Sequence, residues 1–245
     1  MNYKDKVVII TGAGGGIGLA TATRFANLQA NIVLVDIDAE QLQKTAATIT
    51  ATGSSEVLPL VCDVTVEAAV QKVVEDTMRR WGRLDVVVNN AGLMIFKPIE
   101  EQTLEDWIKV FSVDLFGAFF FIKHAFKTMK AGGAIVNVSS IHALVTEPMV
   151  APYAAAKAAL LSLTRSASLE GKPKGIRVNA ILPGAIDTPM LWSNPNVKAG
   201  IEKINKKDVG KPEDIANAIA YLGSPEAAFI QGAMLTVDGG RLDRL

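Results

Sequence analysis

The chain alternates short, strongly apolar runs with longer segments of helical pattern along its whole length. The runs rich in Val and Ile span residues 7–10, 32–35, 57–61, 86–88, 134–138, 177–181 and 234–237. Strands this apolar on both sides are typical of a parallel sheet that helices cover on each face. The alternation therefore predicts an α/β fold, a doubly wound sheet of about seven parallel strands with helices on both faces.

Helical patterns fill the intervals between these strands. They span residues 17–28, 39–52, 66–81, 104–129, 152–169 and 212–222. The last begins with Pro212, Glu213 and Asp214, which suit a first turn because proline needs no hydrogen bond there and acids stabilise the positive helix end. No linker, repeat or low-complexity tract interrupts the series, so residues 1–245 are predicted to form a single domain.

The segment 184–209 breaks this rhythm. It contains Pro189 and Pro195 among isolated apolar residues such as Met190 and Trp192. Such a segment is either a surface loop that packs down or a mobile flap over a site, and the residues alone favour neither. We expect a substrate flap at about 184–209.

Charge and cysteine usage argue against several classes of protein. The 245 residues carry 25 basic and 25 acidic side chains, so a formal net charge of zero offers no electrostatic footprint for nucleic acid. The single cysteine, Cys62, cannot form an internal disulfide, and no Cys and His cluster has metal-site spacing. No apolar run approaches the ~20 residues that span a bilayer, and no signal-peptide pattern precedes the first strand. We expect a cytoplasmic protein without a metal, a nucleic-acid partner or a membrane partner.

A glycine-rich turn follows the first strand and leads directly into the first helix. Glycines let the backbone turn tightly and approach a pyrophosphate, whose charge the helix N-terminus stabilises. Such clusters also occur for chain geometry alone, but the position between strand and helix favours a dinucleotide site. The predicted cofactor residues of this turn are Thr11, Gly12, Gly14, Gly15, Gly16, Ile17 and Gly18.

Asp36 ends the second predicted strand, eighteen residues after Gly18. That spacing is close to the ~20 residues at which an acid binds the adenosine ribose of a dinucleotide. A carboxylate accepts hydrogen bonds from both ribose hydroxyls and repels a 2′-phosphate, and neither Gly14 nor Ile37 offers a positive charge to hold that phosphate. NAD is therefore favoured over NADP, with Asp36 and Ile37 in its site, although Asp36 as a plain turn residue is the alternative.

Tyr153 and Lys157 lie four residues apart at the start of a predicted helix, so their side chains share a face. A tyrosine with a pKa of about 10 is a poor base at neutral pH, but a nearby ammonium group lowers that pKa. Ser139 and Ser140 follow the fifth strand, and one of their hydroxyls can hydrogen-bond a reacting oxygen. The pair alone is a weak signal, whereas the glycine turn, a strand-end serine and this pair in this order are specific.

Across nearly its whole length the chain resembles the short-chain dehydrogenase/reductase family. The matching residues are Thr11 with Gly12, Gly16 and Gly18, Asp36, Asp63-Val64, Asn89-Asn90-Ala91-Gly92, Ser140, Tyr153 with Lys157, Asn179, Pro183-Gly184 with Thr188, and Val237-Asp238-Gly239-Gly240. The resemblance implies a Rossmann-type fold and a nicotinamide cofactor. It also implies a homotetramer built on the helices at 104–129 and 152–169.

The same resemblance implies roles for further residues in the cofactor site. Asp63 and Val64 flank the adenine in this scheme, and Ile186 and Thr188 contact the nicotinamide carboxamide. The other residues expected to line the cofactor are Asn90, Ala91, Gly92, Tyr153, Lys157, Pro183 and Gly184.

The implied mechanism has Ser140 orient and polarise the substrate oxygen while Tyr153 exchanges a proton with it. Lys157 lowers the pKa of Tyr153 and binds the nicotinamide ribose. Asp114 departs from the family, which usually has asparagine in this Asn-x-x-Gly pattern. We expect Asp114 to support a water-linked proton relay to Lys157 through its backbone carbonyl and a local helix distortion, with altered pH dependence.

His124 and His142 are the only histidines in the sequence, too few and too misplaced for a nucleophilic triad. We expect His124 to be structural, because it lies on an apolar helix. His142 follows Ser140 by two residues, where the family's substrate pocket forms, and is included with Ser140 and Tyr153 among the substrate-binding residues. Cys62 is interpreted as a small core residue instead of a nucleophile.

The expected function is that of an NAD-dependent oxidoreductase. Its partner is a small-molecule secondary alcohol, such as a polyol, sugar or cyclic alcohol, or the corresponding ketone. A 3-oxoacyl-carrier-protein reductase is an alternative that the general pattern resembles, but such reductases usually prefer NADPH, so Asp36 counts against it. A non-catalytic dinucleotide sensor is a third alternative, supported by Asp114 and opposed by the intact Ser140, Tyr153 and Lys157.

Overall fold

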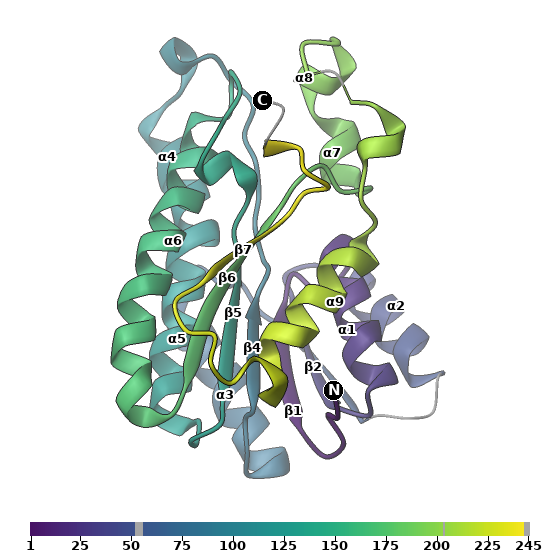
Figure 1. Ribbon diagram of the computed structural model, residues 1–245, viewed down its shortest axis with the longest axis vertical. Coiled ribbons are helices and arrows are strands. Elements are labelled where there is room, and N and C mark those ends of the chain that lie inside the picture. The colour runs from purple at the N-terminus through teal and green to yellow at the C-terminus, as the bar shows by residue number, and fades with distance from the viewer. Residues whose placement is uncertain (52–55, 203, 243–245) are drawn as a thin grey trace.

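The computed structural model describes residues 1–51, 56–202 and 204–242 and contains a parallel sheet (Figure 1). Within the described residues the sheet has seven strands in the order β3-β2-β1-β4-β5-β6-β7. Their bounds are β1 Val7–Thr11, β2 Asn31–Asp36, β3 Val57–Val61, β4 Val86–Asn89, β5 Ala134–Val138, β6 Arg177–Pro183 and β7 Met234–Val237. The predicted Rossmann-type, doubly wound fold is confirmed, and each predicted strand lies within one or two residues of its observed bounds.

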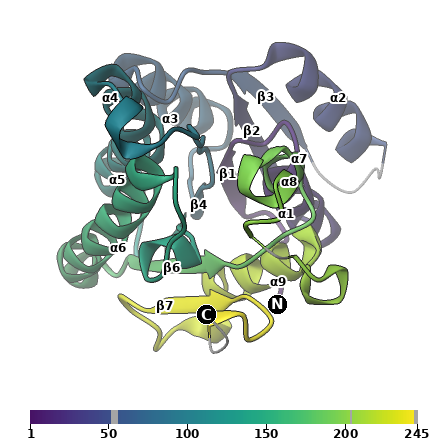
Figure 2. The same cartoon turned by 90° about the horizontal axis from the view of Figure 1, so that it is seen from above.

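Helices cover both faces of the sheet. Figure 2 shows α1, α2 and α9 on one side and α3 to α6 on the other. The helix bounds are α1 Gly16–Asn27, α2 Ala39–Thr50, α3 Glu67–Trp81, α4 Leu104–Phe111, α5 Gly117–Thr128, α6 Ala151–Gly171, α7 Pro189–Ser193, α8 Pro195–Lys198 and α9 Pro212–Gly223. No helix in the described part of the chain is long and apolar enough to cross a membrane.

The central strand β1 explains why the apolar runs are continuous instead of alternating. Val8 and Ile10 belong to the core under α1, α2 and α9, whereas Val7 and Ile9 belong to the core under α3 and α5. Successive side chains of a strand point to opposite faces, so a strand buried on both faces must be apolar throughout. All four side chains are fully buried.

The strand order places the candidate site. From β1 the chain proceeds through β2 to β3 in one direction, and from β4 through β7 in the other. Ligands of open α/β sheets bind outside the carboxyl ends of the strands where the order reverses, here between β1 and β4. The glycine turn follows β1 directly and therefore lies at this point.

The segment predicted as one helix at 104–129 is divided in the structure. A five-residue π-helix, Ser112–Phe116, separates α4 from α5 and contains Asp114. The helix distortion implied by the family resemblance is therefore present. Single turns of π-helix inside helices occur frequently at functional sites.

The described part of the irregular segment 184–209 contains the short helices α7 and α8, which the sequence analysis did not predict. Both α7 and α8 begin with a proline, Pro189 and Pro195, which is well suited to a first helical position. Figure 1 shows α7 and α8 at the carboxyl end of the sheet, near the last described residues of the chain. The predicted helix 39–52 ends at Thr50, and its last residue, 52, lies outside the described residues.

Candidate active site

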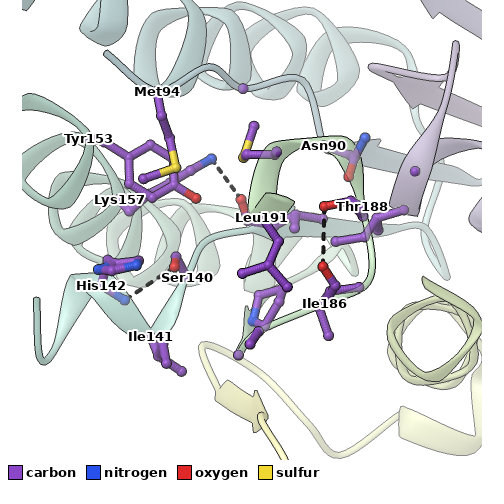
Figure 3. Close-up of a pocket in the computed structure, with 18 of the residues that line it drawn as sticks. Asn90, Met94, Ser140, Ile141, His142, Tyr153, Lys157, Ile186, Thr188 and Leu191 are labelled. Carbon is purple, nitrogen blue, oxygen red and sulfur yellow. Dashed lines mark hydrogen bonds between the residues drawn. The ribbon is translucent and has the colours of Figure 1, made fainter. Parts of the chain in front are cut away.

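A cavity of about 390 Å³ opens at the carboxyl ends of the strands. Figure 3 shows side chains from the segments after β4, β5 and β6 and from α6 and α7 converging on it. The predicted site residues that line it are Gly12, Gly15, Gly16, Ile17, Asp36, Asn90, Gly92, Ser140, His142, Tyr153, Lys157, Pro183, Gly184, Ile186 and Thr188. The fold thus brings most of the predicted cofactor and catalytic residues to one cavity.

The glycine turn has the shape of a phosphate cradle. Gly12 and Gly16 have positive φ angles of 63° and 51°, a conformation that favours glycine. A Cβ on Gly18 would lie 1.9 Å from the carbonyl oxygen of Gly12, so α1 can pack against the turn only with glycine there. A Cβ on Gly15 would meet open space, and Gly15 caps α1 without a side-chain hydrogen bond. The free N–H groups of this helix end fit an anionic pyrophosphate.

Thr11 and Asn90 hold the cradle in place from behind. The Oγ1 of Thr11 accepts hydrogen bonds from the backbone N–H groups of Asn90 and Ala91, both at 2.9 Å. The Nδ2 of Asn90 donates to the carbonyl oxygens of Thr11 and Gly12 at 2.9 and 3.1 Å. These contacts join the carboxyl ends of β1 and β4, and they give Thr11 a structural position behind the turn, outside the cavity.

Asp36 lies beside the glycine turn at the end of β2. Its Oδ2 accepts a hydrogen bond from the N–H of Gly14 at 2.8 Å, and its Oδ1 accepts one from the N–H of Asp38 at 3.0 Å. The carboxylate is partly exposed and lines the cavity. It is therefore available to the hydroxyls of a ribose bound next to the turn.

A second group of side chains lies across the cavity from the glycine turn and consists of Ser140, Tyr153 and Lys157. All three are buried. Ser140 follows β5, and its Oγ accepts a hydrogen bond from the N–H of His142 at 3.1 Å (Figure 3). Tyr153 and Lys157 lie in the first two turns of α6, and the Nζ of Lys157 is 5.5 Å from the centre of the Tyr153 ring. Of the two candidate serines, Ser139 donates to the carbonyl oxygen of Lys157 at 2.9 Å, which fixes it in a structural role.

The Tyr153 pKa differs from the expectation drawn from the Tyr153–Lys157 spacing. Burial raises the pKa of Tyr153, Lys157 lowers it, Asp114 raises it, and a hydrogen bond with Ser140 lowers it. The net direction is upward from the ordinary value. Lys157 acts in the expected direction, but burial and the Asp114 carboxylate outweigh it.

Asp114 contacts Lys157 through its side chain. Its Oδ1 lies 3.0 Å from the Nζ of Lys157, and its Oδ2 accepts a hydrogen bond from the N–H of Leu93 at 3.0 Å. Burial, the largest effect, raises the pKa of Asp114 despite Lys157 and Leu93. Burial alone would lower the pKa of Lys157, but Asp114 and then Tyr153 more than offset it and leave that pKa raised. The sequence predicted a contribution of Asp114 through its backbone, and the structure shows in addition a direct ion pair of its side chain with Lys157.

His142 lines the cavity next to Tyr153. The two ring centroids are 5.9 Å apart in an edge-on arrangement. Burial, the largest effect, lowers the pKa of His142; Glu147 raises it, Arg241 lowers it further, and the net direction is downward. His124, in contrast, lies away from the cavity with its Nε2 3.0 Å from the Oε1 of Glu67, and this partner agrees with the structural role expected for it.

The segment after β6 forms the wall next to the glycine turn. A Cβ on Gly184 would lie 2.7 Å from the Cβ of Asp238, which explains a glycine where β6 and β7 end side by side. The Oγ1 of Thr188 donates to the carbonyl oxygen of Ile186 at 3.3 Å (Figure 3). The methyl group of Thr188 faces Gly16. Ile186 and Thr188 therefore line the cavity beside the glycine turn.

Several predicted residues lie outside the cavity. Asp63 accepts two hydrogen bonds from Thr65, Val64 packs against Gly117, and the side chain of Ile37 is exposed. The predicted residues in this group are Thr11, Gly14, Gly18, Ile37, Asp63, Val64, Ala91 and Asp114. Cys62 is buried, and burial followed by the nearby Asp63 raises the pKa of its thiol to about 11, which does not suit a nucleophile.

Three polar residues that the sequence analysis missed also line the cavity, namely Asn194, Glu202 and Arg241. Arg241 follows the matched Val237–Gly240 motif, and that position was the one available signal for it. Asn194 and Glu202 come from the irregular segment around α7 and α8, where no periodic pattern places a side chain. Among the described residues, no group of three His, Cys, Asp or Glu side chains could hold a metal ion.

Comparisons with known proteins agree with this geometry. Residues 12–241 match the family model described as enoyl-(acyl carrier protein) reductase. An uncharacterized oxidoreductase of Thermotoga maritima is 40% identical, with 98% of each chain covered. The 3beta-hydroxysteroid dehydrogenase 1 of Eggerthella lenta is 36% identical over 98% of this chain and 94% of its own.

Solved structures are similar over the whole chain. Levodione reductase superposes with a TM-score of 0.93 at 36% identity and full coverage of both chains. An NAD⁺-bound xylitol dehydrogenase gives a TM-score of 0.89 at 32% identity, covering 98% of this chain and 100% of its own. A short-chain dehydrogenase from Burkholderia cenocepacia in complex with NADP gives 0.91 at 30% identity, with 98% of each chain covered. Similar proteins thus bind both forms of the nicotinamide dinucleotide.

Proposed function

The chain belongs to the short-chain dehydrogenase/reductase family of NAD(P)-dependent enzymes that act on CH–OH groups, and from that premise we propose that it prefers NAD and interconverts a secondary alcohol and its ketone. The proposed substrate class is a polyol, sugar or cyclic alcohol. One observation carries the proposal. Ser140, Tyr153 and Lys157 line the same cavity as an intact glycine cradle and Asp36.

The preference for NAD rests on Asp36. Its carboxylate borders the cavity and accepts a hydrogen bond from Gly14, so a 2′-phosphate at the adenosine ribose would approach a negative charge. The neighbouring residues Ile37 and Asp38 supply no cation to offset it. We assign the adenine to the side of Asp63 and Val64 and the nicotinamide to the side of Ile186 and Thr188.

We propose the following roles at the reacting end of the cavity. The bound nicotinamide supplies the hydride-transfer chemistry. Ser140 holds the substrate oxygen, and the hydroxyl of Tyr153 takes the alcohol proton during oxidation or returns it during reduction. Lys157 favours the phenolate form of Tyr153 and donates to the nicotinamide ribose. Because all three groups are buried and held by α6 and β5, positioning and charge stabilisation account for most of the gain in rate.

We also propose that residues 184–209 act as a flap over the substrate. Met190 and Leu191 of α7 line the cavity, so a movement of this segment changes the space above Tyr153. Asn196, which is fully buried, donates to the carbonyl oxygen of Pro148 at 2.9 Å. This contact ties the flap to the loop before α6.

We propose that the protein is located in the cytoplasm. The lone buried thiol of Cys62 suits that reducing compartment.

A panel of secondary alcohols and ketones with NAD(H) and NADP(H) tests the proposal. We expect NADH formation from at least one polyol, sugar or cyclic alcohol, and a drop in kcat of about 10²–10⁴-fold in Tyr153→Phe. A strong preference for NADPH and a 3-oxoacyl thioester would favour the carrier-protein reductase instead. Tight NAD binding without turnover of any alcohol would favour a sensor.

The variant Asp36→Ala tests the cofactor assignment separately. We expect its dissociation constant for NAD to rise about 10–100-fold, because hydrogen bonds to a charged group contribute about 1.5–3 kcal/mol. Binding of NADP should be unchanged or stronger, since the repelling charge is gone. The matched control is Asp38→Ser, which removes a neighbouring carboxylate but keeps an oxygen to cap α2. Equal weakening of both dinucleotides in Asp36→Ala would contradict the assignment.

A further inference from the structure

Four polar side chains from separate segments contact one another at the end of the cavity that contains His142 and Tyr153. Glu147 comes from the loop before α6, Asn194 lies between α7 and α8, Glu202 follows α8, and Arg241 follows β7. The Nδ2 of Asn194 donates to the Oε1 of Glu147 at 2.8 Å and to the Oε2 of Glu202 at 3.2 Å. Arg241 forms an ion pair with Glu202.

Three of these side chains face the cavity. Asn194, Glu202 and Arg241 line it together with His142, whose ring contacts Tyr153. The side chains of Glu202 and Arg241 are each only 14% exposed, so both are largely withdrawn from solvent. Arg241 follows the edge strand β7, whereas Asp36 ends β2 near the opposite edge. The four-residue cluster therefore lies on the side of the cavity that contains Tyr153, away from the adenosine-ribose site predicted at Asp36.

The charges of the cluster favour a neutral ligand. Among the described residues that line the cavity, the cations are Lys157 and Arg241, and each already has a carboxylate partner. Burial and the adjacent Glu147 raise the pKa of Glu202 to about 7 although Arg241 opposes them. An anionic substrate would meet the carboxylate of Glu202, with that of Glu147 behind Asn194, and no free cation would balance them. A hydroxyl group can donate to Glu202, and a hydroxyl or carbonyl oxygen can accept from Arg241.

The same cavity also has apolar lining. Met94, Ile141, Met190 and Leu191 border it together with Tyr153 and the cluster. The hydrocarbon part of a ligand can contact this apolar lining. One ligand oxygen would then lie at Tyr153 and another at the polar cluster. Buried polar groups that lose water on ligand binding need a hydrogen-bonding partner on the ligand.

We propose that Glu202 and Arg241 form a second polar recognition site, which selects uncharged substrates that carry another hydroxyl or carbonyl group remote from the reacting carbon. This inference deepens the proposed function and rests on it. It assigns specificity to residues that lie outside the catalytic cluster, in the flap and the C-terminal segment.

The same contacts also tie together the flap, the loop before α6 and the C-terminal segment. A purely structural latch would affect all substrates alike, because it would act through the shape of the whole cavity. Recognition of a second oxygen affects only the substrates that carry it. The two roles are therefore separated by comparing matched substrates.

The test measures kcat/KM with NAD for cyclohexanol, the cyclohexanediols and an anionic hydroxycyclohexanecarboxylate. We expect the wild-type protein to prefer at least one diol over cyclohexanol by about tenfold or more, and to use the anion poorly. Glu202→Gln and Arg241→Gln should each lower kcat/KM for that diol by about 10–100-fold and leave cyclohexanol within about twofold. The control Glu213→Gln, an exposed acid at the start of α9, should change neither.

Thermal unfolding and NAD affinity show whether each variant is folded. If Arg241→Gln does not fold, Arg241→Lys replaces it in the test, because it keeps the positive charge opposite Glu202. We expect Arg241→Lys to show a smaller loss of kcat/KM for the diol. Equal losses on cyclohexanol and the diol, or a wild-type preference for cyclohexanol or the anion, would overturn the inference. Failure of the proposed function would look different, because no alcohol would then be oxidised in a Tyr153-dependent way, and the inference would fall with it.

Discussion

The ion pair between Asp114 and Lys157 adds a negative charge that acts on Tyr153. Both partners are nearly completely buried, and the carboxylate raises the pKa of Lys157 and of Tyr153. In the role that we propose for it, Tyr153 is deprotonated during alcohol oxidation, so a raised pKa moves activity to higher pH. Removing one member of a buried ion pair lowers the free energy of unfolding, and this loss is smaller if the replacement side chain is still polar.

The variant Asp114→Asn should shift the oxidative pH profile to lower pH. Removing the negative charge favours the phenolate of Tyr153, and therefore the rising limb of kcat against pH moves toward acid. We expect the plateau at high pH to stay within about twofold, because there Tyr153 is already deprotonated in the wild type. The measurement is the pH dependence of kcat with a saturating alcohol.

Asp114→Ala serves as the second variant in that experiment. It removes the charge and the hydrogen bond to Leu93, so it should show the same acid shift with an added loss of stability. A large gain in turnover at every pH in Asp114→Asn would show that the native carboxylate impairs the relay. An unchanged profile would show that Asp114 does not act on Tyr153.

The residue types of the catalytic cluster were predictable, but their energetics were not. Tyr153 and Lys157 are four apart on a helix, and that spacing alone places them on one face. The direction of the Tyr153 pKa depends on its burial and on Asp114, which is far from it in sequence and reaches Lys157 through the π-helix. Only the tertiary structure supplies these two effects.

The turn between β1 and α1 shows how glycines in one element serve different purposes. Gly18 faces the carbonyl oxygen of Gly12, so its lack of a side chain allows the packing of α1. Gly15 faces open space at the cavity, and its φ of −173° is extended backbone that any residue adopts. Gly18 is therefore expected to matter for folding, and Gly15 for the access of the cofactor to the turn.

Alanine substitutions should separate these two roles. We expect Gly18→Ala to lower the free energy of unfolding by about 2–4 kcal/mol, because the added methyl group overlaps backbone atoms. Gly15→Ala should stay within about 0.5 kcal/mol of wild type and weaken NAD binding about tenfold, since its methyl group enters the cavity. Denaturant unfolding and NAD titration measure the two effects. Unaltered NAD affinity in a folded Gly15→Ala would contradict a pyrophosphate site there.

Elements with long periodic patterns were predicted well, and short or irregular ones were not. The apolar strands were found because burial on both faces demands continuous Val and Ile. The helices α7 and α8 have five and four residues, too few to show a helical period. Consequently Asn194 and Glu202, which these helices position, were missed together with Arg241.

At the scale of the whole molecule, several large apolar side chains remain exposed on one side. Leu104 on α4 and Leu169 on α6 are 75% and 73% exposed, and Ile108, Phe116 and Phe119 are also exposed. Figure 2 shows α4, α5 and α6 together along this side. Exposed apolar side chains that gather on one side of a protein are typical of an interaction site, and these are the helices on which we propose that a homotetramer forms.

Sedimentation should give four times the chain mass of 26.0 kDa. We expect the double variant Phe119→Glu/Leu169→Glu to sediment as a smaller species, because it places charges in the proposed interface. The control Val66→Glu adds a charge at an exposed apolar position at the start of α3 and should leave the mass unchanged. A wild-type protein that sediments as a single chain would contradict the homotetramer.

Transfer of a deuterium label tests the central claim most directly. The protein is mixed with NAD and an accepted secondary alcohol that carries deuterium on the hydroxyl-bearing carbon, and the cofactor is analysed by mass spectrometry. We predict one deuterium per NADH formed by the wild type, and formation slowed by about 10²–10⁴-fold in Tyr153→Phe with NAD binding retained. NADH without deuterium, or equal rates in the two proteins, would contradict direct hydride transfer assisted by Tyr153.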